Sequence, residues 1–237
     1  MQITPLIPIL NNNSIYNLAY QYIIGAKTVL GRNILNYKKR EIDYIINYIN
    51  ERGNSGLILD LGCSTGQFTR ALATKFGYSH VQGADVSLSS IHRCRKRDPD
   101  LTFHYIANEF YHENRGKYQY VLLSHVIEHM HNPKAFLRGL KGLFRGDGSL
   151  IICIPQERIR GDSALPENLY NLVRFKFENV HKVKYSLDSI TLLLSEVGFL
   201  FRKSKYIHAF RPGKDQKSFA NHSLVVFCEL AQSKKVN

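Results

Sequence analysis

Two histidines with an acidic residue between them follow an apolar run in the middle of the chain. The run Tyr118–Ser124 leads into His125, Glu128 and His129, within the segment SHVIEHMHNP. A histidine whose pKa lies near neutrality can accept the proton of a hydroxyl group, so His125 and His129 are candidate general bases. The alternative for each is a structural histidine that forms hydrogen bonds at the start of a helix.

A glycine-containing turn indicates a ligand site earlier in the chain. The stretch LILDLGCSTG begins with Leu57–Leu61, which is typical of a strand buried on both faces of a parallel sheet. Gly62 and Gly66 follow it, and because they lack a Cβ atom, backbone N–H groups can come close to a ligand. Ser64 stands where the dinucleotide-binding GxGxxG pattern requires a glycine, so that pattern is excluded.

An acidic residue ends the next expected strand. With a helix over Gln67–Phe76 and a strand over His80–Ala84, Asp85 comes about twenty residues after the glycine turn. A carboxylate at this position can accept both hydroxyls of a ribose. Asp85 could instead be the N-cap of the following helix, and the two roles are compatible.

Together these motifs resemble those of the class I S-adenosylmethionine (SAM)-dependent methyltransferases. SHVIEHMHNP is similar to the segment after the fourth strand in the branch that includes the ubiquinone-biosynthesis O-methyltransferases (methyltransferase type 11/23). The resemblance implies that Asp85 binds the ribose, that Asn108 replaces the Asp that commonly contacts the adenine, and that Ser124 and His125 lie beside the reactive methyl group. The residues implied for SAM binding are Asp60, Gly62, Cys63, Gly66, Asp85, Val86, Asn108, Glu109 and Ser124.

The resemblance covers residues 57–230 in order and implies an α/β, Rossmann-like fold: a seven-stranded, mostly parallel sheet with an antiparallel C-terminal hairpin and helices on both faces. The expected strands are Leu57–Leu61, His80–Ala84, Leu101–Ile106, Tyr118–Ser124, Ser149–Ile154, Phe199–Ala209 and Asn221–Leu230. The expected helices are Ser14–Leu30, Asn36–Asn50, Gln67–Phe76, Leu88–Arg97, Pro133–Phe144 and Ser186–Val197. We expect residues 1–50 to form a helical cap and 51–237 the methyltransferase domain, with a lid inserted at 156–184.

Composition bounds the setting and the partners. The chain of 237 residues carries 32 Lys and Arg against 19 Asp and Glu, and the basic residues gather at 93–97 and 202–217. Such clusters are more often solvated faces than nucleic-acid sites, although the charge permits the latter. The four cysteines lack CxxC spacing, and no apolar run is long enough to span a bilayer, so we expect a reducing, cytoplasmic location.

The resemblance implies O-methylation of a small-molecule or lipid-like metabolite with SAM as cofactor. One alternative is a metal-assisted RNA methyltransferase, because Glu128, His129 and His181 resemble metal ligands of the small-RNA 3′-end enzymes. His125 replaces the first Glu of their Glu-x-x-Glu-His segment, so we expect no metal. A non-catalytic SAM-binding partner protein is the other alternative, and the sequence leaves the oligomeric state open.

Overall fold

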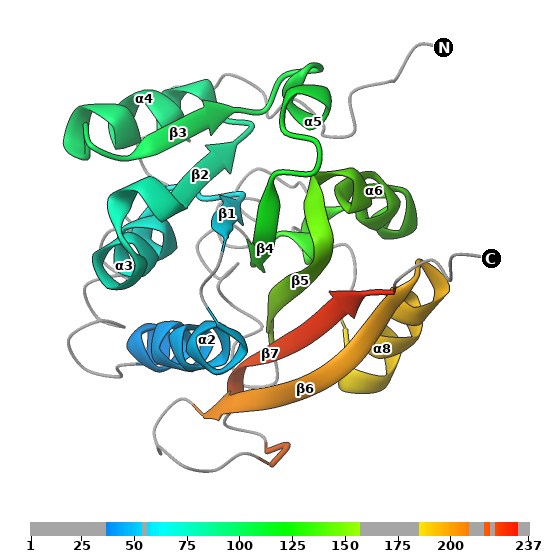
Figure 1. The fold of residues 1–237 in the computed structure, drawn as a ribbon. Helices are drawn as coiled ribbons and strands as arrows, with labels where there is room; N and C mark the ends of the chain where they lie inside the picture. The colour runs from blue at the N-terminus through cyan, green and yellow to red at the C-terminus, as the bar shows by residue number, and fades with distance from the viewer. Residues whose placement is uncertain (1–36, 54–55, 157–184, 209–215, 219–220, 232–237) are drawn as a thin grey trace, which may run out of the picture.

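The computed structural model describes residues 37–53, 56–156, 185–208, 216–218 and 221–231. Its centre is a seven-stranded sheet in the order β3-β2-β1-β4-β5-β7-β6 (Figure 1). The strands are β1 (Leu57–Leu61), β2 (Val81–Asp85), β3 (Thr102–Tyr105), β4 (Tyr118–Ser124), β5 (Phe144–Pro155), β6 (Phe199–His208) and β7 (Asn221–Leu230). The first five strands pair in parallel, and β7 pairs antiparallel with β5 and β6. The expected fold class and C-terminal hairpin are confirmed.

Helices cover both faces of this sheet (Figure 1). One face packs against α2 (Tyr37–Arg52), α3 (Gln67–Phe76) and α4 (Leu88–Arg97). The other packs against α5 (Phe110–Glu113), α6 (Pro133–Leu140) and α8 (Leu187–Glu196). The serine pair Ser186 and Ser189 forms a capping box that starts α8, as the sequence suggests for a helix opening at Ser186.

Alternation along the central strands produces two cores. In β4, Tyr120 and Leu122 join the core beneath α2 and α3, while Val121 and Leu123 join the core beneath α6 and α8. Successive side chains of a strand point to opposite faces, so a strand with helices on both sides must be apolar throughout. The near-continuous apolar runs in the sequence therefore mark the central strands, and their carboxyl ends lie at one edge of the sheet.

Two local expectations are wrong. The strand expected over Ser149–Ile154 begins earlier, at Phe144, and resumes regular pairing with β4 at Ser149 after a register shift. Gly146 adopts a left-handed φ of 57°, so the glycine accommodates an irregularity within the strand and does not end it. The helix expected over 133–144 ends at Leu140 and continues as a 3₁₀ turn, Lys141–Leu143, and the short helix α5 was not expected.

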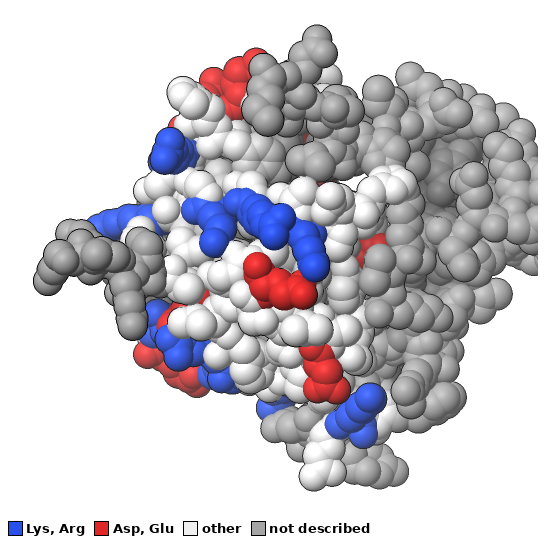
Figure 2. Space-filling model, turned by 90° about the vertical axis from the view of Figure 1, so that its right-hand side faces the viewer, with Lys and Arg blue, Asp and Glu red and all other residues white. Residues whose placement is uncertain are grey.

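Several of the described basic side chains in the two clusters bind neighbouring groups of the protein. Arg95 donates from two nitrogens to the carbonyl of Phe103, at 3.1 and 2.6 Å. The ion pairs are Arg97 with Asp98, Arg202 with Glu229 and Lys203 with Glu51. On the face drawn in Figure 2, the described Lys and Arg side chains form a row with Asp and Glu beside it. The positive charge is thus interleaved with negative charge there.

Several expectations fall on residues 1–36 and 157–184, which lie outside the described residues: the helix Ser14–Leu30, His181 and nearly all of the lid. The division into a cap and a catalytic domain at residue 50 stays a prediction, although α2 itself packs on the sheet through Ile45 and Ile49. Among the helices that are described, none is long and apolar enough to cross a membrane. The cytoplasmic location stays a prediction.

Candidate active site

The glycine turn joins β1 to α3 and is tied to the neighbouring strand by backbone hydrogen bonds. The N–H groups of Gly62 and Cys63 both donate to the carbonyl of Ala84 in β2, at 2.7 and 3.0 Å. Gly62 has a left-handed φ of 84°, and a Cβ atom there would lie 2.5 Å from Cγ2 of Val126. Gly66, at the start of α3, has a φ of 67°. Both positions therefore require glycine, as the sequence predicts.

Asp85 connects this turn to the end of β2. Its Oδ2 accepts the N–H of Ser64 at 2.7 Å, and its Oδ1 accepts the N–H of Ser87 at 2.8 Å. The N-cap of α4 is Ser87, whose side chain accepts from the N–H of Ser90. Asp85 is therefore not the cap. Because a carboxylate oxygen can accept more than one hydrogen bond, both oxygens can still accept from a ligand.

Two further predicted residues lie beneath the turn. Asp60 is buried, and its Oδ2 accepts a 2.7 Å hydrogen bond from the hydroxyl of Thr69. Burial raises the pKa of Asp60 to about 6, against the lowering effect of Thr69. Cys63 is also buried, and a hydrogen bond with Cys94, together with burial, raises its pKa. Cys63 thus behaves as a neutral thiol packed behind the turn.

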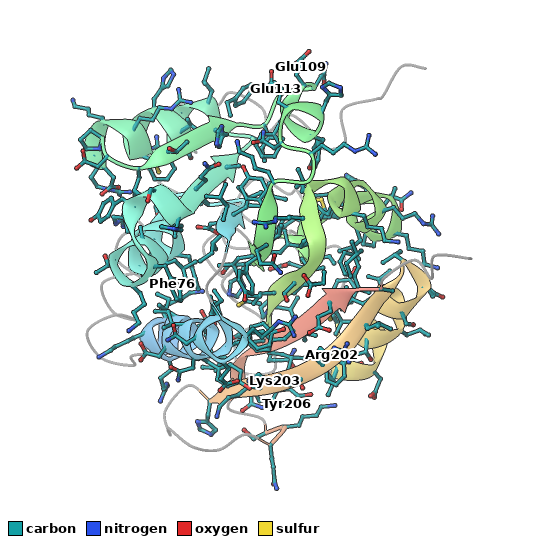
Figure 3. The ribbon with its side chains drawn as sticks, viewed as in Figure 1. Phe76, Glu109, Glu113, Arg202, Lys203 and Tyr206 are labelled. Carbon is teal, nitrogen blue, oxygen red and sulfur yellow. The ribbon has the colours of Figure 1, made fainter. Side chains whose placement is uncertain are left out.

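The remaining predicted cofactor residues follow the neighbouring strands. Val86, after β2, is 38% exposed, an unusual exposure for an apolar side chain. Asn108 and Glu109 follow β3 and are exposed, and Figure 3 places Glu109 at the outer edge of the molecule beside α5. Ser124 is half-buried at the end of β4. The predicted residues therefore lie in or just after the last residues of the adjacent strands β3, β2, β1 and β4, along one edge of the sheet.

His125 follows β4 directly, and its imidazole lies between two acidic side chains. Its N–H donates to the carbonyl of Cys153 in β5 at 2.9 Å, and its φ of 57° is left-handed, which is rare outside glycine. Its Nδ1 is 3.5 Å from Oε1 of Glu128 and its Nε2 is 3.9 Å from Oε1 of Glu41. Backbone strain of this kind is concentrated at functional sites.

Glu41, on α2, is fully buried and interacts with groups from both ends of the chain. The hydroxyl of Ser223 donates to its Oε1, and Lys38 lies 2.9 Å from its Oε2. His222, the second residue of β7, places its Nε2 3.6 Å from the same Oε1. Burial alone would raise the pKa of Glu41, but Lys38, His125 and His222 together lower it well below its usual value.

The pKa values of Glu128 and His125 change in the directions expected for groups of opposite charge. Burial would raise the pKa of Glu128, but His125 and His129 lower it. Burial and Lys38 would lower the pKa of His125, yet Glu128 and Glu41 raise it overall. His129 is 40% exposed, with its Nε2 4.0 Å from Oε1 of Glu128. The charged forms of the two carboxylates and of His125 therefore stabilise one another.

The sequence analysis missed Glu41 and His222. Glu41 precedes Ile45 and Ile49 at intervals of four, so a carboxylate within the apolar stripe of an amphipathic helix was a visible signal. His222 carried no comparable signal, because one histidine at the start of an apolar strand is commonly structural. Only the pairing of β7 with β5 brings it beside the end of β4.

Comparison with known proteins identifies the family. A family model described as a methyltransferase domain matches residues 34–202. No curated protein sequence matches the chain.

Several of the solved structures similar to this one are methyltransferases by name. A SAM-dependent methyltransferase from Aquifex aeolicus has a TM-score of 0.58 and 16% identity, over 90% of this chain and 98% of that one. The magnesium protoporphyrin IX methyltransferase of Synechocystis, with bound SAM, has a TM-score of 0.59 and 15% identity, over 94% and 99%. The 1,6-didemethyltoxoflavin N1-methyltransferase of Burkholderia thailandensis has a TM-score of 0.58 and 15% identity, over 96% and 94%.

These identities establish a shared fold, and the family model covers more than half of the chain. The seven-stranded topology and the glycine turn after β1 agree with both findings. The chain belongs to the methyltransferase-domain family and is a class I methyltransferase whose cofactor is S-adenosyl-L-methionine.

Proposed function

We propose that this methyltransferase methylates an oxygen atom of a small-molecule acceptor and that His125 accepts the acceptor's proton. The observation that carries the proposal is the position of His125, directly after β4 and held between two buried carboxylates. In an open α/β sheet, ligands bind at the carboxyl ends of the strands where the strand order reverses, here between β1 and β4. The acceptor and the cofactor would meet at this point.

The residues at the edge fit the cofactor. The backbone at Gly62 has no room for a Cβ atom, and the carboxylate of Asp85 stands at the tip of β2. We assign Asp85 to the ribose hydroxyls, Val86 with Asn108 and Glu109 to the adenine side, and Gly62, Cys63, Gly66 and Ser124 to the methionine side, with Asp60 supporting the turn.

SAM would supply an activated methyl group. The acceptor oxygen would bond the methyl carbon as the bond from that carbon to the sulfonium sulfur breaks and its electron pair returns to sulfur. The hydroxyl proton would pass to a base. In this chain Nε2 of His125 is buried without a hydrogen-bond partner, so it is the ring atom that can take the proton. Glu41 and Glu128 then stabilise the imidazolium. His129, on the same turn, is the second candidate base.

A small acceptor is favoured over RNA because several basic residues in the described part of the two clusters are already engaged. Arg95 binds a backbone carbonyl, and Arg202 and Lys203 pair with acidic residues. A surface that binds phosphates needs cations free to neutralise them. Two of the similar structures act on small ring compounds, as their names state, so the fold can accommodate such acceptors. The relation to the ubiquinone-biosynthesis branch remains part of this proposal.

The first experiment identifies the acceptor class. Labelled methyl groups from SAM are transferred into a cell extract, which is then separated into RNA, protein and solvent-extractable metabolites. We expect the label in the extractable fraction, as a methyl ether. Label in RNA would contradict the small-molecule proposal, and no transfer to any fraction would favour a non-catalytic SAM-binding protein.

The second experiment tests the base. Because asparagine tolerates a left-handed φ, His125→Asn removes the imidazole with little backbone strain. We expect turnover to fall about 10²- to 10⁴-fold, the usual contribution of a general base, with unchanged SAM affinity. The exposed His92→Ala on α4 is the matched control. If His125→Asn retains full turnover while His129→Ala loses it, the base is His129.

A further inference from the structure

Three potential metal ligands converge beside the proposed acceptor site. Glu41, His125 and His222 each offer one ligand atom, and these atoms lie within 4.8 Å of one another. They come from α2, from the segment after β4 and from the start of β7. Glu41 and His222 are buried, and His125 is half-buried. Among the described residues, this is the group of histidine and carboxylate side chains whose ligand atoms lie close enough together to hold a metal ion.

Two of the separations match those of ligand atoms around one ion. Oε1 of Glu41 is 3.9 Å from Nε2 of His125 and 3.6 Å from Nε2 of His222. Both distances are too long for hydrogen bonds. Ligands bound tetrahedrally at about 2.1 Å lie roughly 3.4 Å from one another, and wider angles increase this separation.

A buried polar atom without a partner gives an independent indication. Nε2 of His125, one of the converging atoms, is buried with no hydrogen-bond partner. Leaving such atoms unpaired costs about 1–3 kcal/mol each, and more for a charged group, so natural proteins retain them where a ligand completes the site. Glu128 is only 2% exposed and lies beside the ring of His125.

The surrounding residues are arranged as in a metal site. Nδ1 of His125 lies 3.5 Å from Oε1 of Glu128, so a carboxylate backs the ring nitrogen opposite the converging atoms. With the ion bound, a hydrogen bond from Nδ1 to this carboxylate would fix the ring and make the ligand more basic. The hydroxyl of Ser223 similarly orients Oε1 of Glu41. Lys38 is the opposing group, because its ammonium lies 2.9 Å from Oε2 of Glu41 and repels a cation.

We propose that Glu41, His125 and His222 bind one divalent transition-metal ion, with Glu128 as a positioning residue. Two nitrogens and one oxygen suit Zn²⁺ or a similar first-row ion, whereas Mg²⁺ and Ca²⁺ require more oxygen ligands. Three protein ligands leave a coordination position open. This set differs from Glu128, His129 and His181, the set that the sequence suggested, and shares none of its members as ligands.

The site rests on the proposed function for the identity of the acceptor and changes one part of it, because it assigns Nε2 of His125 to the ion and not to the acceptor's proton. An ion there can bind the acceptor oxygen and lower the pKa of its hydroxyl. Because the ion then occupies Nε2 of His125, the hydroxyl proton passes to His129. The ion and the proton compete for Nε2 of His125, so a chelator distinguishes the two roles of this residue. If the ion activates the acceptor, removing it slows turnover. If His125 is the base, removing the ion speeds turnover.

The test measures metal binding directly, without an acceptor. Protein dialysed against a chelator is titrated with Zn²⁺ in competition with a chromophoric chelator, and with Co²⁺, whose visible absorption reports the coordination geometry. We expect one ion per chain and a tetrahedral or five-coordinate Co²⁺ spectrum. His222→Ala and Glu41→Gln should each weaken binding at least 10-fold, and Glu128→Gln about 10- to 100-fold. Lys38→Met should tighten it.

Circular dichroism and SAM affinity show that each variant is folded, and His92→Ala controls for loss of an exposed histidine. If a variant fails to fold, Glu128→Gln and Lys38→Met still test the proposal from outside the ligand set. Unchanged stoichiometry and affinity in folded His222→Ala would overturn it. A protein that binds the ion as expected but transfers no methyl group would contradict the proposed function alone.

Discussion

The glycine turn and the cluster of Glu41, His125, Glu128 and His222, here called the His–Glu cluster, lie at the same edge of the sheet but are built differently. At the turn, polar groups are paired with groups close in sequence, as in the bond from Ser64 to Asp85, 21 residues apart. In the His–Glu cluster, Glu41 accepts from Ser223, 182 residues away, and Glu128 has no hydrogen-bond partner.

The difference separates two kinds of structural requirement in the site. The turn needs an exact backbone, so its requirements appear as glycines in one short motif. The cluster needs charges brought together by tertiary packing, and its unpaired atoms leave room for a substrate proton or an ion. In our proposal, cofactor binding therefore depends on a local motif, whereas activation of the acceptor depends on the completed fold.

The largest expected effect concerns the turn. Gly62→Ala adds a Cβ atom 2.5 Å from Cγ2 of Val126 at a φ of 84°. Strain and overlap should together lower the free energy of unfolding by about 2–4 kcal/mol and abolish measurable SAM binding. Urea unfolding and calorimetric titration with SAM measure the two effects.

Gly116→Ala is the matched control for that variant, because Gly116 also has a left-handed φ, 63°, but has open space around it. It should cost about 1 kcal/mol and leave SAM binding intact. Equal losses in Gly62→Ala and Gly116→Ala would show that the close approach to Val126 does not matter.

An intermediate effect is expected at Asp85. Asp85→Ala removes the acceptor for the N–H groups of Ser64 and Ser87, and with it the proposed ribose contact. Hydrogen bonds to a charged group contribute about 1.5–3 kcal/mol, so SAM affinity should fall roughly 10- to 100-fold. Calorimetric titration measures it, with the exposed Asp100→Ala as the control. Unchanged affinity in Asp85→Ala would remove the ribose assignment.

The smallest effect is a pH dependence of stability from the His–Glu cluster. The pKa of His125 is raised above 6.5, so its stabilising contribution is complete below that value and is lost as pH rises through the folded-state pKa. Glu41 and Glu128 have pKa values lowered from 4.5, so their contribution is present above that value and is lost as pH falls through their folded-state values.

Stability should therefore decline on both sides of a window between about pH 5 and the raised pKa of His125. Urea unfolding at a series of pH values measures it. In His125→Asn the decline on the alkaline side should flatten, while the acid side remains in part through Lys38. An alkaline decline that persists unchanged in the variant would assign it to another group.

Much of the fold followed from patterns within the sequence. Buried strands and amphipathic helices carry strong sequence patterns, so several elements have the predicted bounds. These are the strands Leu57–Leu61, Tyr118–Ser124 and Asn221–Leu230 and the helices Gln67–Phe76 and Leu88–Arg97. The start of β5 was mispredicted because glycines that usually form a turn instead accommodate an irregularity in a strand.

Local sequence was enough to predict the glycine turn, Asp85 and the position of His125 after β4, since each depends on a strand and the few residues beyond it. By contrast, the positions of Glu41 and His222 beside His125 arise from long-range packing. Their meeting depends on α2 packing over the sheet and on β7 inserting between β5 and β6. Contacts between segments so distant in sequence produce no pattern in the sequence around either residue, because they depend on how whole helices and strands pack together.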